Sequence, residues 1–197
     1  MNDLWFRPFI WLDYRLAVLF LLIAPLVLLI WTLVQQSPAM HRLVLIYWRV
    51  ASLWLITLYL MIPGWPIAYF SGFLARLLVP LALWFWVDLN DEIKDLPPSW
   101  LKLVVTVWRW SVTFYCSLSA LLLIPFLSCG LGAQVVNQDF CQVWFQVPWH
   151  YKEWFHSRAT PGFLGFLGIV GLIIYGLYFL YFLAIRLGRQ GRSALEQ

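Results

Sequence analysis

Four charged residues lie inside or at the end of long apolar segments, and they are the first candidates for chemistry in this chain. Arg49 and Arg109 each lie about eight residues inside such a segment, which is roughly 12 Å at the rise of an α-helix. An arginine at that depth in a membrane is costly unless it reaches the surface or finds a partner. Asp88 ends another apolar segment and could neutralise either arginine. We interpret such a pair first as structural; a site for an anionic lipid or a cofactor phosphate, and an ion or proton path, are the alternatives.

Arg76 is the most deeply placed of these residues, near the middle of the apolar segment 67–87. No acidic residue is close to it in the sequence. Because an intramembrane charge needs a partner, either this segment does not fully cross the membrane or Arg76 contacts something outside the chain. We expect a contact with a lipid or with a partner subunit.

The remaining polar residues include one pattern that could bind a metal. His150, Glu153 and His156 suggest a metal site, but two histidines six residues apart lie about 240° apart around a helix. Helical zinc sites place their histidines at i and i+4, so a polar surface is the better interpretation. No nucleophile elbow, phosphate-binding loop or dinucleotide fingerprint is present in the sequence. We therefore predict no catalytic residues, no metal and no cofactor, and we expect that the protein is not an enzyme.

Composition decides the fold class. Of the 197 residues, 63% are hydrophobic and 11% are charged, and the mean hydropathy is +0.79. A soluble fold could not cover that much apolar surface, whereas lipid solvates it. The 14 Trp and 9 Tyr fit the same class, because their rings favour headgroup depth. The sequence predicts an all-α integral membrane protein with a single transmembrane helical domain.

Five apolar segments are long enough to form transmembrane helices. They cover residues 14–34, 41–62, 67–87, 101–127 and 162–185. The residues before Tyr14 mix aromatic and charged side chains, which predicts an interfacial segment ahead of the first span. Residues 128–161 form the one large extramembrane loop, and its aromatic part, residues 143–156, is expected to lie in the interface. No histidine lies inside a predicted span, so a histidine-ligated pigment within the bundle is not expected, whereas a bound lipid is compatible with the sequence.

The basic residues favour an orientation with the carboxyl end in the cytoplasm. Five spans in that orientation leave eight of the 13 Lys and Arg residues on the cytoplasmic side. If residues 67–87 re-enter instead, the amino end moves to that side and nine are cytoplasmic, so charge does not separate the two models. Both place the loop 128–161 on the lumenal or periplasmic side, where disulfides are permitted. We therefore predict a disulfide between Cys129 and Cys141.

The last span carries two side-chain patterns that are suited to contacts between helices. Small residues let helix backbones approach closely in lipid, and glycines recur at every third position at Gly162, Gly165, Gly168 and Gly171. Further along, an aromatic stripe is formed by Tyr175, Tyr178, Phe179 and Phe182. Such a stripe usually faces lipid or a neighbouring helix, and a platform for a pigment or quinone is the alternative.

Four stretches carry a family resemblance: Leu4–Pro8, Trp11–Phe20, Ile46–Ser52 and Leu83–Asn90. They resemble an uncharacterised family of cyanobacterial multi-span membrane proteins of about this length. The resemblance implies a photosynthetic bacterial host, and therefore a thylakoid or plasma membrane. It implies no activity and no site residues.

These observations together favour a non-enzymatic accessory protein. We expect a small subunit or an assembly and stability factor of a larger membrane complex, plausibly photosynthetic, with membrane lipids and other membrane subunits as partners. The net charge of +4 does not predict a nucleic-acid partner, because the basic residues are scattered and form no stripe. The alternative function is a small transporter or channel that uses Arg49, Arg76, Arg109 and Asp88.

Overall fold

The computed structural model describes residues 5–194, and over these residues the regular structure is entirely helical. Five helices are long and apolar enough to cross a membrane. They comprise Arg7–Val34, Pro38–Met61, Ile67–Trp84, Trp100–Gly130 and Pro161–Arg186. The predicted fold class is therefore confirmed, and the chain is an integral membrane protein.

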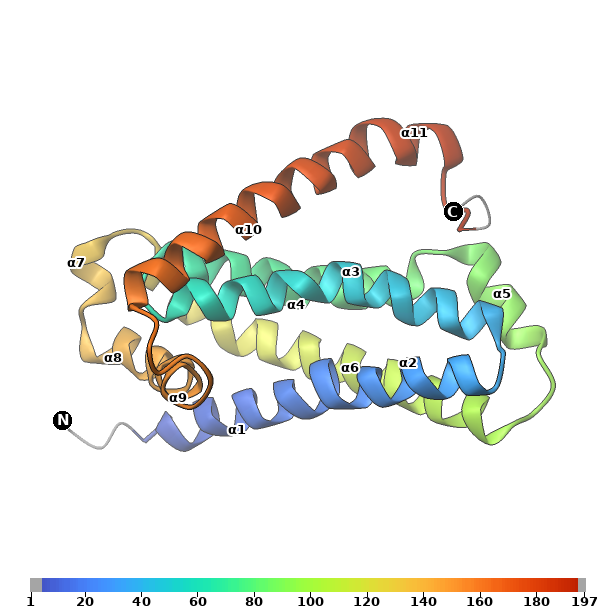
Figure 1. The fold of residues 1–197 in the computed structure, drawn as a ribbon, viewed down its shortest axis with the longest axis horizontal. Coiled ribbons are helices and arrows are strands. Elements are labelled where there is room, and N and C mark those ends of the chain that lie inside the picture. The colour runs from blue at the N-terminus through green and yellow to red at the C-terminus, as the bar shows by residue number, and fades with distance from the viewer. Residues whose placement is uncertain (1–4, 195–197) are drawn as a thin grey trace.

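The five long helices run alternately along one axis (Figure 1). The first consists of α1 (Arg7–Ala17), a π-helical segment (Val18–Ile23) and α2 (Ala24–Val34). The next three are α3 (Pro38–Met61), α4 (Ile67–Trp84) and α6 (Trp100–Leu123), and the last is α10 (Pro161–Tyr181). The first helix begins at one end of the bundle, and α10 runs toward the opposite end (Figure 1). α4 runs along the bundle as one continuous helix that is long and apolar enough to cross a membrane (Figure 1), as the five-span prediction requires.

The first helix starts earlier than predicted. The residues before Tyr14 do not form a separate interfacial segment, because the helix begins at Arg7. Pro8 lies in its first turn, where proline is favoured since the missing N–H would have no partner there. The extension adds almost two turns and brings Asp13 into the helical bundle, which decides the environment of Arg76.

Pro25 interrupts the first helix without ending it. Proline cannot donate to the carbonyl four residues earlier, which is that of Leu21. The backbone widens into the π-helical segment just before Pro25, and the Tyr47 hydroxyl of α3 donates to the Leu21 carbonyl at 2.7 Å. The Trp108 indole of α6 donates in the same way to the Phe20 carbonyl at 3.0 Å. Groups freed by the interruption are thus satisfied by neighbouring helices, as an apolar solvent requires.

The loop between α6 and α10 folds into a cap over one end of the bundle (Figure 1). It contains a 3-10 helix (Ile124–Gly130), α7 (Ala133–Val136), α8 (Asp139–Gln142), a further 3-10 turn (Val143–Phe145) and α9 (Gln146–Phe155). Cys129 and Cys141 form the predicted disulfide, and both are fully buried. The Tyr69 hydroxyl of α4 donates to the Cys141 carbonyl at 2.7 Å, which fixes the cap to the helices beneath it.

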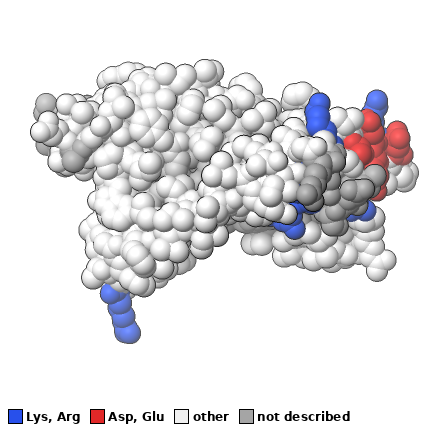
Figure 2. All heavy atoms as spheres, turned by 90° about the horizontal axis from the view of Figure 1, so that it is seen from above, with Lys and Arg blue, Asp and Glu red and all other residues white. Residues whose placement is uncertain are grey.

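The opposite end of the bundle carries the acidic stretch of the sequence. It folds as α5 (Val87–Asp95), which buries Leu89 and Ile93 and exposes Asp91, Lys94 and Asp95. Figure 2 shows a wide uncharged region on one face of the molecule, with most of that face's charged side chains gathered toward this end. This arrangement is expected when the uncharged region faces hydrocarbon.

Three of the four glycines in the predicted stripe bring α10 against the end of α3. A Cβ on Gly165 would lie 2.6 Å from the Pro63 ring, and one on Gly168 would lie 2.9 Å from the Leu60 side chain. A Cβ on Gly171 would lie 3.2 Å from Ile56, whereas one on Gly162 would meet nothing within 4 Å. Gly165, Gly168 and Gly171 therefore lie in close contact with neighbouring segments of the chain, as a packing role requires, whereas Gly162 precedes the contact.

We expect Gly168→Val to lower the stability of the protein by about 1–3 kcal/mol, because the added side chain must displace Leu60 in a close contact. Gly176→Val is the matched control, since a Cβ there meets nothing within 4 Å. The control can even gain stability, because glycine is a poor helix former. Thermal unfolding of both variants in mild detergent checks this. Equal losses for the two variants would show that the close approach of α10 and α3 is unimportant.

Candidate functional site

A buried ion pair joins three of the long helices near the cap. Arg76 of α4 donates through Nη2 to Oδ2 of Asp13 in α1 at 2.7 Å, and through Nε to the Ser119 hydroxyl of α6 at 2.7 Å. The Ser119 and Tyr115 hydroxyls in turn donate to Oδ1 of Asp13, at 2.5 and 2.9 Å. The side chains of Arg76 and Asp13 are only 4% and 11% exposed. The expectation that Arg76 contacts a lipid or a partner subunit is therefore wrong, because its acid comes from the same chain.

Arg109 binds the carboxyl end of α4 instead of an acid. Its Nη2 donates to the Leu83 carbonyl at 2.8 Å and to the Asn90 side-chain oxygen. The guanidinium lies over the Trp84 ring, 4.1 Å from the centroid. A cation at a helix carboxyl terminus is favoured by the unpaired carbonyls and the helix dipole. The predicted pair with Asp88 is not formed at Arg109, since these carbonyls and the indole ring supply its partners.

Asp88 holds the carboxyl-terminal tail of the chain. Its Oδ2 accepts from the Ala194 backbone N–H at 2.7 Å and from the Ser193 hydroxyl at 3.0 Å. Nε of Arg192 donates to the carbonyl of Phe85, three residues before Asp88, at 2.8 Å. Residues 192–194 are thereby fixed to the junction between α4 and α5, so the chain returns to the bundle after α10.

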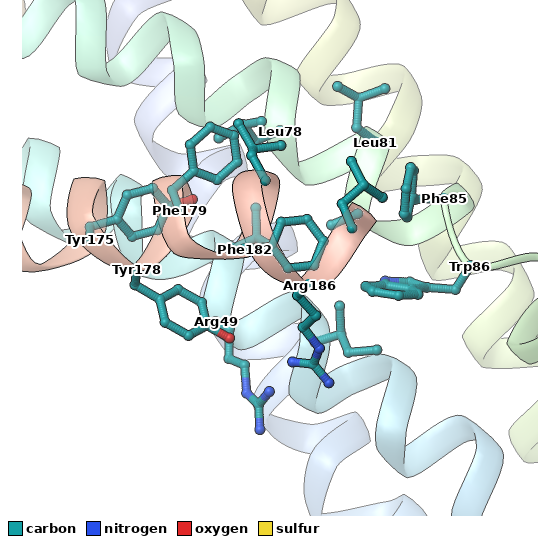
Figure 3. A pocket seen from close by; sticks show the side chains of 15 residues that line it. Arg49, Leu78, Leu81, Phe85, Trp86, Tyr175, Tyr178, Phe179, Phe182 and Arg186 are labelled. Carbon is teal, nitrogen blue, oxygen red and sulfur yellow. The ribbon is translucent and has the colours of Figure 1, made fainter. Parts of the chain in front are cut away.

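Arg49 lies at a crevice between α10 and the neighbouring helices α3 and α4. The crevice has a volume of about 330 Å³ and is lined almost entirely by apolar side chains, together with Arg49 and Arg186. In Figure 3 both guanidiniums point to the same side, away from the cluster of aromatic rings. The Arg49 side chain is exposed, and within residues 5–194 its guanidinium forms no hydrogen bond or ion pair. The aromatic stripe predicted on the last span supplies one wall of this crevice, through Tyr175, Tyr178, Phe179 and Phe182.

The two histidines of the cap have different neighbours. Nε2 of His156 lies 2.8 Å from the Tyr59 hydroxyl of α3, whereas Nδ1 of His150 lies 3.4 Å from Glu153 on the exposed face of α9. They do not converge on a common point. Among the described residues, no group of three His, Cys, Asp or Glu side chains is arranged to hold a metal ion.

Sequence reasoning missed Asp13, Ser119, Asn90 and Arg186. Two signals could have found Asp13: Pro8 marks an earlier helix start, and apart from Asp3 it is the only acidic residue before Asp88. Ser119 lies in α6 and Asn90 in α5, and both are short polar residues with no distinguishing spacing. In the sequence Arg186 directly follows the last predicted span, and only the course of α10 brings it beside Arg49.

The two polar arrangements differ in what they can do chemically. The Asp13–Arg76 cluster is buried, and its polar groups form hydrogen bonds with one another. These bonds fix the relative positions of α1, α4 and α6. The crevice combines an apolar wall with the exposed guanidinium of Arg49 and the half-buried Arg186, which suits a ligand that has an apolar body and an anionic end.

No curated protein and no solved structure matches this chain. The model of one family, described as a protein of unknown function (DUF3177), matches residues 7–195. The match covers both the Asp13–Arg76 cluster and the crevice. It confirms the resemblance to an uncharacterised family, and because it spans nearly the whole sequence, the chain belongs to the DUF3177 family.

Proposed function

We propose that this protein is a non-enzymatic accessory protein of a larger membrane complex, either a small subunit or an assembly and stability factor. The observation that carries the proposal is the way in which buried charges are used. Arg76, Asp13 and Arg109 make contacts that join one helix of the bundle to another. Such contacts hold helices in place, whereas a transporter or channel needs polar groups along a shared path.

The outer face of α10 is the surface that we assign to a partner. Of the five long helices, the last one (Pro161–Arg186), which contains α10, is the least buried. In its most apolar stretch 17% of the residues are buried, against 28–56% in the other four helices. Its outer side chains are large and apolar, including Ile173, Ile174, Leu177 and Leu180. A transmembrane helix of another subunit would cover this face by van der Waals packing, as helices associate in lipid.

The membrane and orientation are also part of the proposal. A thylakoid or plasma membrane of a photosynthetic bacterium, and a photosynthetic complex as the partner, rest on the family resemblance alone. A cytoplasmic carboxyl end rests on the basic residues near α5 and the tail. The disulfide in the cap supports the same orientation, because it favours an oxidising compartment for the loop 128–161.

The test is a native gel of host membranes that carry a tagged copy, solubilised in gentle detergent, with mass spectrometry of whatever migrates with it. We expect migration with a larger complex, and we expect Ile173→Ala with Leu177→Ala to weaken it. Leu26→Ala with Ile30→Ala, on the exposed face of α2, is the matched control and should leave it intact. Migration as a monomer or a symmetric oligomer would contradict the accessory function and direct attention to flux assays on Arg49 variants.

A further inference from the structure

The crevice beside α10 is held open because the chain is fixed at both of its ends. At one end, Gly165 and Gly168 bring α10 into close contact with Pro63 and Leu60. At the other end, residues 192–194 bond to Phe85 and Asp88. Between these points α10 diverges from α3 and α4 (Figure 1). The space of about 330 Å³ is therefore a consequence of the fold and is present before any ligand binds.

The walls of the crevice are suited to a hydrocarbon chain. Tyr175, Phe179 and Phe182 line one wall, and Leu78 and Leu81 of α4 face them (Figure 3). Apolar side chains on both walls offer dispersion contacts to an acyl chain and no polar group that its binding would leave unpaired.

The edge of the crevice carries positive charge. Arg49 and Arg186 point to one side of the crevice, and the Tyr178 hydroxyl lies on the same side as Arg49 (Figure 3). The Arg49 guanidinium is exposed and has no acidic partner within residues 5–194. Guanidinium groups bind phosphate oxygens through two parallel, charge-assisted hydrogen bonds, so an anionic headgroup would supply the missing partner.

We propose that this crevice binds an anionic membrane lipid, with the headgroup phosphate on Arg49 and Arg186 and an acyl chain between α10 and α4. We favour a lipid over a partner helix, because the site combines apolar walls with an Arg49 guanidinium that has no acidic partner within residues 5–194. An uncharged quinone or pigment would match the aromatic wall but would leave Arg49 without an acidic partner. The site is independent of the accessory function, since it lies on the inner side of α10.

The test is a binding titration on the full-length protein, delipidated in mild detergent, with dioleoyl phosphatidylglycerol and dioleoyl phosphatidylcholine as probes. Native mass spectrometry counts the bound lipids. We expect the wild type to prefer the anionic lipid, and Arg49→Gln to weaken its binding by about tenfold, as the loss of charged hydrogen bonds implies. Arg42→Gln removes the same charge from the amino-terminal half of α3, but Arg42 lies outside the crevice, so this variant should leave binding unchanged.

A second variant tests the position of the acyl chain. Ala82 lines the crevice, and Ala82→Phe should fill part of the space and weaken binding of the anionic lipid while both arginines remain. Circular dichroism of each variant before titration shows that it has folded. Equal binding of the two lipids by the wild type, an equal loss in Arg42→Gln and Arg49→Gln, or undiminished binding in Ala82→Phe would each overturn the proposal.

Discussion

Asp13→Asn should destabilise the protein by about 3–5 kcal/mol, because removal of one partner leaves the other charge of a buried pair without compensation. The variant keeps the size of the side chain but removes the charge that holds Arg76, whose side chain is 4% exposed. Thermal unfolding in detergent, followed by size-exclusion chromatography, measures the loss. Asp91→Asn is the matched control. Because Asp91 is exposed on α5, this variant should lose little stability.

A double variant separates the contribution of the pair from that of its parts. Asp13→Leu with Arg76→Met replaces both charges by apolar side chains, which in buried ion pairs is often neutral or stabilising. We therefore expect the double variant to be more stable than Asp13→Asn. Two results would contradict this role of the ion pair. One is equal stability of Asp13→Asn and Asp91→Asn, and the other is a double variant that is no more stable than Asp13→Asn.

Loss of the disulfide in the cap should cost about 3 kcal/mol, the value that the chain-entropy model gives for a loop of this length. Cys129 and Cys141 are 12 residues apart in the sequence, and their bond constrains the unfolded chain. Reductant should lower the unfolding temperature of the wild type toward that of a variant with Cys129→Ser and Cys141→Ser. The double variant itself should not respond to reductant.

A count of thiols tests the disulfide directly. Cys116 is the one free cysteine of the chain and is buried in α6. Alkylation of the denatured protein should therefore label one cysteine without reductant and three with it. Labelling of Cys129 and Cys141 without reductant would contradict the bond.

The transmembrane helices could be predicted to within a few residues, except for the start of the first. Long apolar segments mark the spans, and prolines and polar residues at Pro38, Pro63–Pro66 and Pro97–Pro98 mark their ends. The start of the first helix was missed because aromatic and charged residues are also typical of an interfacial segment. Composition does not distinguish a helix that enters the membrane from one that lies on it.

The partners of the intramembrane charges could not be predicted, because they come from distant parts of the sequence. Asp13 and Arg76 are 63 residues apart, and their contact depends on which faces of α1 and α4 meet. Trp48-Arg49 and Trp108-Arg109 look alike in the sequence, yet Arg109 contacts α4 and α5 while Arg49 is exposed. The difference arises from the rotation of each helix in the bundle, which local sequence does not determine.

The crevice depends on the tilt of α10, which the sequence does not predict. The sequence predicts only the two patterns on α10 that contribute to the crevice. The glycines predicted a close contact and the aromatic residues predicted a contact surface, and both are present in α10. Their combination with the bonds of residues 192–194 to Phe85 and Asp88 creates the space beside Arg49. Each of those bonds joins a side chain to a backbone group far away in the sequence, and such a pairing has no signal in the sequence.

The central claim, that α10 joins this protein to another membrane protein, is tested most directly by photo-cross-linking in host membranes. A photoreactive amino acid at Ile173 on α10 is compared with one at Ile30 on α2, since both side chains are 57% exposed. We predict that Ile173 gives a reproducible cross-link to one other protein and that Ile30 reacts with lipid. Cross-links to lipid alone at both positions would contradict the claim.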